Sequence, residues 1–81
     1  MKVIHWFDLG QEKLPRSAKV LHCGLRDGAP VAWCEVERGD TEWKEVIRLP
    51  TGSDAPPEPF RHIGTVTGLQ GWMVFHYYIK D

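Results

Sequence analysis

Apolar and polar residues alternate over much of the chain, in runs about as long as a β-strand. The clearest run spans Val31 to Arg38, where Ala32, Cys34 and Val36 occupy every second position. The intervening positions end in acidic residues. A period of two is typical of a strand with one buried face, so we expect the face that carries these three residues to lie in the core.

Glycine, proline and Asp-Gly pairs divide the chain into strand-length pieces. The expected strands are residues 2–9, 11–14, 19–26, 31–38, 41–49, 61–67 and 72–80. No window has convincing helical periodicity, because Pro15 interrupts the best candidate. The sequence therefore predicts an all-β fold with little or no helix. We expect a small antiparallel meander or half-open barrel of six to seven strands, forming a single β domain over residues 1–81.

The same pattern predicts turns and strand faces. Asp27-Gly28-Ala29-Pro30 indicates a tight hairpin, and a four-residue turn there would place Cys23 opposite Cys34. Gly39-Asp40 predicts a second hairpin, and the proline-rich stretch 50–59 predicts a long loop. The expected faces are Leu21, Cys23 and Leu25 together, Trp43, Ile47 and Leu49 together, and two apolar faces in 72–80, as in a central strand.

Composition narrows the classes of function. The chain has ten basic and eleven acidic residues, and the basic ones form no cluster. This composition argues against binding a nucleic-acid polymer. No apolar run is long enough to span a membrane, so no membrane association is expected. The chain reads as cytosolic, where cysteines are usually reduced. A domain of 81 residues has a small core, which favours a homo-oligomer.

Few residues suggest chemistry. Cys23 and Cys34 are either a redox pair or half a zinc site, or two small buried hydrophobes, and we favour the last. His76 as a base would need a neighbouring nucleophile such as Thr65, and a packed histidine with one hydrogen-bonded nitrogen is the simpler interpretation. Gly64 fits a β-bulge or a close backbone contact better than a phosphate loop. We therefore expect no enzyme, no cofactor and no metal site.

Two sets of residues are candidates for binding. Four tryptophans are many for so small a core, and Trp33 and Trp43 share strand faces with Glu35 and Glu45, so we predict a partner surface there. The alternative is a tryptophan-rich core. The second set surrounds the proline-rich loop and would bind a small anionic ligand; the alternative is a solvated connector. Its members are Arg48, Thr51, Ser53, Arg61 and His62.

Several segments together resemble a family of small uncharacterised proteins encoded mostly by bacteriophages and prophages. They are Ala18 to Leu21, Gly28 to Trp33, Ile63 to Thr65 and Gly71 to His76. The loop departs from the pattern, because Pro50-Thr51-Gly52-Ser53 keeps only part of a Gly-Thr-Gly element. The resemblance implies a phage origin and expression in the host bacterial cytoplasm, and it implies no activity.

The leading hypothesis is a small non-enzymatic phage accessory protein that binds a host protein, with inhibition of a host defence as its purpose. The alternative is an oligomer that sequesters a small anionic ligand such as a nucleotide signal. Convergence of Arg48 and Arg61 on a concave subunit interface would favour the ligand, and a flat surface with Trp and Glu would favour the protein partner. A virion component stays open, as does an enzyme with His76 or His62 beside a Ser, Thr or Asp in a cleft.

Overall fold

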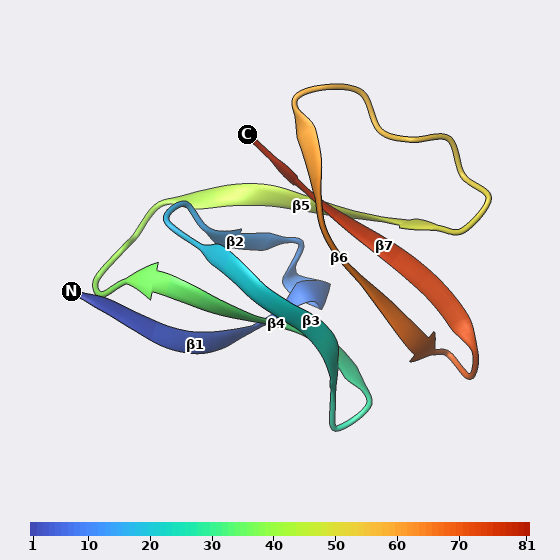
Figure 1. The fold of residues 1–81 in the computed structure, drawn as a ribbon, viewed down its shortest axis with the longest axis horizontal. Coiled ribbons are helices and arrows are strands. Elements are labelled where there is room, and N and C mark those ends of the chain that lie inside the picture. Colours follow the sequence, from blue (N-terminus) through green and yellow to red (C-terminus); the bar gives the residue numbers. More distant parts are fainter.

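The computed structural model describes residues 1–81 as two antiparallel β-sheets (Figure 1). The elements are β1 (Lys2–Asp8), the 3₁₀ turn η1 (Leu9–Gln11), β2 (Lys13–Pro15), β3 (Lys19–Arg26), β4 (Ala29–Glu37), β5 (Trp43–Pro50), β6 (Phe60–Leu69) and β7 (Met73–Lys80). The first sheet has the order β1-β4-β3 and the second the order β2-β5-β7-β6. The predicted all-β class is confirmed, in its half-open barrel form. No helix is long and apolar enough to cross a membrane.

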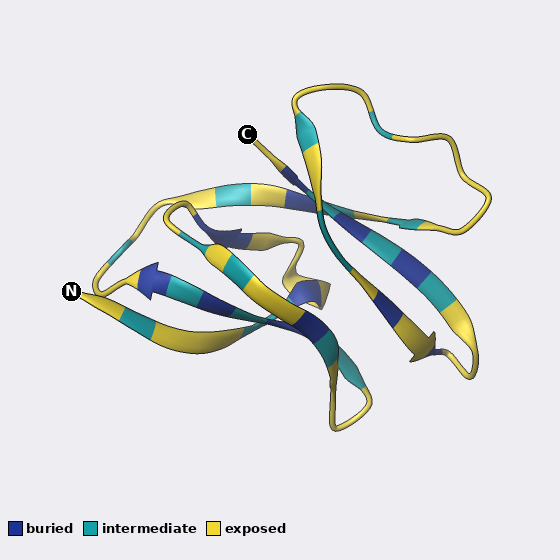
Figure 2. Ribbon diagram, viewed as in Figure 1, coloured by how far each residue is buried: buried dark blue, intermediate teal, exposed yellow.

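The core lies between the two sheets, and each sheet contributes every second residue of its strands. Figure 2 shows the buried positions spaced along β4 and β7 with less buried positions between them. Ala32, Cys34 and Val36 of β4 are buried, as predicted. The cluster consists of Leu9, Leu14, Cys23, Ala32, Cys34, Val36, Val46, Val66, Leu69, Phe75, Tyr77 and Ile79. β7 lies between β5 and β6, so the prediction of a central strand is also confirmed.

The predicted face of β3 is wrong at Leu21, whereas the residues grouped in β5 do share a face, though not the one that enters the core. In β3 the register skips Leu21, a bulge that moves Val20 and Cys23 toward the core. Leu21 is left 48% exposed, whereas Leu25 stays in phase with Cys23 and approaches Gly68 of β6. In β5 Trp43, Ile47 and Leu49 are in phase as predicted, but the core residue is Val46 on the opposite face. A bulge shifts the alternation in a way that no local pattern reveals.

The hairpin at Asp27-Gly28 is tighter than predicted. Both residues have positive φ, 53° and 80°, as a two-residue type I′ turn requires. Arg26 therefore pairs with Ala29, so Cys23 lies opposite Ala32 and not opposite Cys34 as expected. The right-handed twist of the strands favours this turn, in which Asp27 and Gly28 alone form the loop.

Gly39 and Asp40 do not close a hairpin, although the sequence predicts one. The strands on either side, β4 and β5, belong to different sheets, so this segment is a crossover. The Asp40 carboxylate accepts hydrogen bonds from the backbone N–H groups of Ser17 (2.8 Å) and Glu42 (3.0 Å). The Ser17 hydroxyl in turn accepts the Glu37 N–H at 3.0 Å. These bonds tie the crossover to the β2–β3 turn and direct the chain into the second sheet.

Gly64 marks the place where β3 packs against β6. The β6–β7 register shifts between His62 and Gly64, so a bulge lies here. A Cβ atom at Gly64 would lie 2.8 Å from the Cys23 Cβ and would also collide with the Cys23 Sγ. The Cys23 thiol donates to the Ile63 carbonyl at 3.8 Å. Both features expected of Gly64, a bulge and a close contact, are confirmed.

Candidate functional site

The outer face of the first sheet carries a cluster that we call the aromatic face: Ile4, Trp6, His22, Arg26 and Trp33. Trp33 is the centre of a row across the sheet, with Trp6 opposite it on β1 and His22 opposite it on β3. The rings of His22 and Trp33 stack with centroids 5.7 Å apart. The Arg26 guanidinium lies over the Trp6 ring, 4.2 Å from its centroid. Short cross-strand pairing thus brings together residues from three strands.

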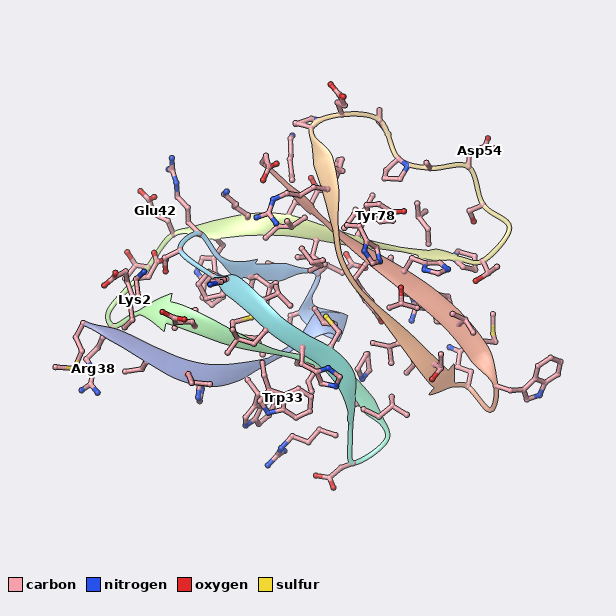
Figure 3. All side chains as sticks on the ribbon, viewed as in Figure 1. Lys2, Trp33, Arg38, Glu42, Asp54 and Tyr78 are labelled. Carbon is pink, nitrogen blue, oxygen red and sulfur yellow. The ribbon has the colours of Figure 1, made fainter.

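No element of the chain covers the aromatic face. Ile4 is 68% exposed and Trp6 is 38% exposed, whereas Trp33, between Trp6 and His22, is half-buried. Figure 3 shows Trp33 on the side of the first sheet that lies away from the second sheet. Val31, on the same side of β4 as Trp33, is buried yet lies outside the core cluster between the sheets. The aromatic face therefore has a small apolar base and an accessible apolar surface.

The residues predicted to bind a partner divide between two surfaces. Trp33 and Glu35 lie on the aromatic side of the first sheet, where Glu35 faces Ile4 and Lys19. Trp43 and Glu45 lie on β5 of the second sheet, with the Lys13 ammonium 4.8 Å from the Trp43 ring centroid.

Of the two tryptophans predicted to be the exposed pair, Trp43 is exposed and Trp33 is half-buried. Sequence reasoning passed over Trp6 and over Trp72, which is 90% exposed beside the β6–β7 turn. Trp6 alternates with Ile4 along β1, but its position beside Trp33 depends on a strand pairing distant in sequence.

A chain of hydrogen bonds on the second sheet joins the proline-rich loop to β6 and β7. The Thr51 hydroxyl lies 2.8 Å from His76 Nε2, and the Thr65 hydroxyl lies 2.9 Å from His76 Nδ1. The Thr65 hydroxyl also lies 3.0 Å from His62 Nε2. The His62 ring meets Tyr78 edge-on, with centroids 5.4 Å apart. Both nitrogens of His76 are therefore engaged, where one was expected.

The chemical capacity of this histidine–threonine chain is limited. A shallow pocket of about 200 Å³ lies beside it, lined by residues 50–55 together with Leu49, His76 and Tyr78. A hydroxyl within reach of an imidazole is one requirement of nucleophilic catalysis. A second is a group that orients the base and stabilises its charged form, usually a carboxylate. Thr51 and Thr65 occupy both nitrogens of His76, so no carboxylate bonds to it, and the arrangement acts best as a clamp on the loop.

The other predicted ligand-binding residues do not join this chain. Ser53 lines the shallow pocket. Arg61 precedes His62 on β6 and points to the opposite face of the sheet. Arg48 is paired with Tyr77, so it also lies on the face opposite His76. Arg61 Nε is bonded to the Asp81 carboxylate at 2.7 Å. The Arg48 guanidinium lies 4.3 Å from the Phe75 ring centroid. The two arginines have separate contacts and do not converge on one ligand.

The cysteines behave as buried hydrophobes, as favoured from the sequence. Both are free, and they are 8% and 0% exposed at Cys23 and Cys34 respectively. Burial raises the pKa of each thiol to about 11, with a smaller contribution at Cys34 from the charge of Cys23. Such thiols stay protonated and unreactive near neutral pH. No three His, Cys, Asp or Glu side chains gather as a metal ion would require.

Comparison with known families decides the relationship of the chain. The sequence profile of a family described as a domain of unknown function, DUF7352, matches residues 1–81. The chain belongs to the DUF7352 family. The expectation of an uncharacterised family is thereby confirmed. No curated protein matches the chain, and no solved structure does. The function of this DUF7352 domain must therefore be argued from its own surfaces.

Proposed function

We propose that this DUF7352 domain is a small, non-enzymatic binding protein and that the aromatic face contacts a partner protein. The observation that carries the proposal is the uncovered row of Trp6, Trp33 and His22, with Arg26 stacked on Trp6. Tryptophan and arginine are the residues most enriched at the energetic centres of protein interfaces. An apolar patch with polar groups around it on a small protein is a typical interaction site.

The shape of the aromatic face supports a protein partner over a small ligand. None of the four pockets on the molecule is lined by Ile4, Trp6, His22, Arg26 or Trp33. Small molecules bind in concave sites, whereas proteins bind to broad, nearly flat ones. Within one chain Arg48 and Arg61 have separate contacts, so their placement gives no support to a nucleotide-sequestering role. Glu35, beside Lys19, supplies charged groups at the edge of this surface.

The resemblance to phage proteins suggests where the partner is found. The phage-like segments, Ala18 to Leu21 and Gly71 to His76 among them, support a phage accessory protein that acts in the host bacterial cytoplasm. Its partner there is a host protein, and inhibition of a host defence is the role that a small binding protein without catalytic groups would serve. This form rests on the resemblance alone.

The test compares two exposed tryptophans on different surfaces. Tagged wild type, Trp6→Ala and Trp72→Ala chains are expressed in a bacterial host and recovered with their bound proteins, which quantitative mass spectrometry measures. Loss of a central interface tryptophan costs about 2 kcal/mol or more, so Trp6→Ala should lower affinity for the true partner at least about tenfold. Trp72→Ala should leave it unchanged. The affinity is then measured by calorimetry with the purified partner.

Two results would contradict the proposal. A partner that binds Trp6→Ala as well as wild type does not use the aromatic face. Equal losses in Trp6→Ala and Trp72→Ala would indicate a general effect on the protein. Circular dichroism and thermal unfolding of each variant establish that the comparison is between folded chains.

A further inference from the structure

The hydroxyl of Tyr77 is buried without a hydrogen-bond partner. Tyr77 lies in the middle of β7, its residue is 1% exposed, and it is the one buried side chain of the protein whose polar atom is unpaired. Buried polar groups are nearly always hydrogen-bonded, because an unpaired one loses its bonds to water and gains nothing in return. Each exception therefore calls for a physical reason.

Tyr77 forms part of a pocket of about 260 Å³. The pocket lies between the η1 segment and strand β5, and its lining residues are Leu9, Gly10, Glu12, Val46, Ile47, Arg48 and Tyr77. More polar than apolar surface faces the pocket, because Leu9 and Val46 are almost fully buried and Ile47 lies on the opposite face of β5 from Val46. Its volume suits a small molecule of several heavy atoms.

Arg48 adds a positive charge to the same pocket. Its guanidinium lies over the Phe75 ring, forms no salt bridge with a carboxylate, and approaches the Tyr77 hydroxyl closely enough to lower the pKa of that group. In contrast, Arg16 and Arg61 are each paired with a carboxylate. A guanidinium stacked on an aromatic ring keeps its in-plane N–H groups available, and their fork matches the two oxygens of a carboxylate.

We propose that this pocket binds a small organic monocarboxylate. The carboxylate accepts hydrogen bonds from Arg48 and from the Tyr77 hydroxyl. Burial raises the pKa of Tyr77 and the Arg48 guanidinium offsets part of that rise, so the phenol remains a proton donor near neutral pH. The site is independent of the aromatic face and of the protein partner proposed for it.

Acidic neighbours make the pocket selective for a single negative charge. Glu12 lines the pocket, and the charge of Asp8 is close enough to contribute to the raised pKa of Tyr77. Asp8 is already engaged, since its carboxylate accepts the Gly10 N–H at 2.8 Å. These carboxylates would repel a doubly charged phosphate more strongly than a monocarboxylate.

Titration with two probes tests the proposal. Benzoate and inorganic phosphate are added separately to ¹⁵N-labelled protein, and amide chemical shifts are followed. Benzoate should produce saturable shifts at Gly10, Glu12 and Ile47, and phosphate should produce much weaker ones. Tyr77→Phe and Arg48→Gln should each weaken benzoate binding at least about tenfold, because each removes a hydrogen bond to a charged group. Arg61→Gln, which removes a salt-bridged arginine elsewhere, should leave binding unchanged.

The competing explanation is an ordered water on the Tyr77 hydroxyl. In that case Tyr77→Phe lowers the melting temperature and wild type shows no saturable benzoate shifts, which overturns the proposal. If the pocket awaits a ligand, Tyr77→Phe without benzoate should keep or raise the melting temperature, because it removes an unpaired hydroxyl. Benzoate binding that is equal in wild type and Arg48→Gln would also overturn it.

Discussion

At the scale of single residues, the fold depends on a close fit between Cys23 and Gly64. The sulfur of Cys23 occupies the space that a side chain at residue 64 would need, and its thiol donates to the neighbouring Ile63 carbonyl. Glycine is required here for its lack of a Cβ atom and not for a positive φ. The sequence alone indicates a special position at Gly64, whereas the identity of the residue that fills the space depends on how β3 crosses β6.

We predict that Gly64→Ala destabilises the protein by about 1 to 3 kcal/mol, the usual cost of an extra methyl group in a packed interior. The measurement is the free energy of unfolding in urea. The control is a double-mutant cycle with Cys23→Gly, which removes both atoms that the new methyl group would meet. The alanine should cost less in that background. Additive costs would show that the two positions do not share the contact.

The two buried thiols predict a loss of stability at alkaline pH. Their pKa values rise from 9.0 to about 11 on folding, because burial disfavours the thiolate. Below pH 9 both states keep the thiol protons, so stability does not change. Between about pH 9 and 11 the unfolded chain loses its protons first, so the free energy of unfolding falls by up to roughly 2 to 3 kcal/mol for each thiol.

The measurement is the free energy of urea unfolding at pH 8.5 and pH 11, for wild type and for the double variant Cys23→Ala/Cys34→Ala. The double variant should be less stable at pH 8.5, since it has lost core contacts, yet it should fall less between the two pH values. Tyrosine and lysine titrations largely cancel in the comparison, because the charge of Cys23 is only a minor cause of the raised pKa of Tyr77. Equal falls would contradict the assignment.

At the scale of elements, the local pattern predicts where strands begin and end but not how they pair. Gly, Pro and Asp-Gly punctuation is local chemistry, so the bounds of β3 are predicted as Lys19–Arg26 and observed as such. The bulge at Leu21 and the crossover at Gly39-Asp40 depend on partners distant in sequence. Asp40 stabilises the crossover, since its carboxylate accepts hydrogen bonds from the backbone N–H groups of Glu42 and of Ser17.

We predict that Asp40→Ala lowers the melting temperature at pH 7. Hydrogen bonds from Ser17, with a further one from Glu42, lower the pKa of Asp40 below 3.8. A lowered pKa means that the stabilisation is present above pH 3.8 and disappears as pH falls through the lower folded value. The difference between wild type and Asp40→Ala should therefore shrink in acid. Asp54→Ala, at an exposed carboxylate without a hydrogen bond, is the matched control and should have no effect.

At the scale of the whole molecule, the candidate sites arise from pairings that no linear pattern contains. Trp6 lies opposite Trp33 because β1 pairs with β4. His76 reaches both Thr51 and Thr65 because β7 lies between β6 and β5, the strand that leads into the proline-rich loop. Sequence reasoning could select Trp33, Thr51 and His62 as individual candidates. It grouped Thr51 with His62, which one chain of hydrogen bonds joins, but it also grouped Trp33 with Trp43, which lie on different sheets. The unpaired Tyr77 hydroxyl was beyond its reach, because burial without a partner is a property of the assembled core.

The exposed aromatic face also predicts self-association of the isolated protein. Only 14 of 81 residues are buried, and Ile4 and Trp6 remain in contact with solvent on an edge strand of the first sheet. A second copy that covers this face would bind the folded state alone, so it would raise the melting temperature by mass action. We expect the melting temperature of wild type to rise between about 5 and 200 µM protein, as mass action requires.

Ile4→Lys should remove most of this concentration dependence, because a lysine on an edge strand opposes pairing with another chain. Trp72→Ala, at an exposed tryptophan in the β6–β7 turn, should retain it. Sedimentation equilibrium at the same concentrations measures the association directly. If wild type stays monomeric and its melting temperature is constant, self-association is excluded. The aromatic face would then be left to a different protein, and the affinity comparison of Trp6→Ala with Trp72→Ala would decide the function by itself.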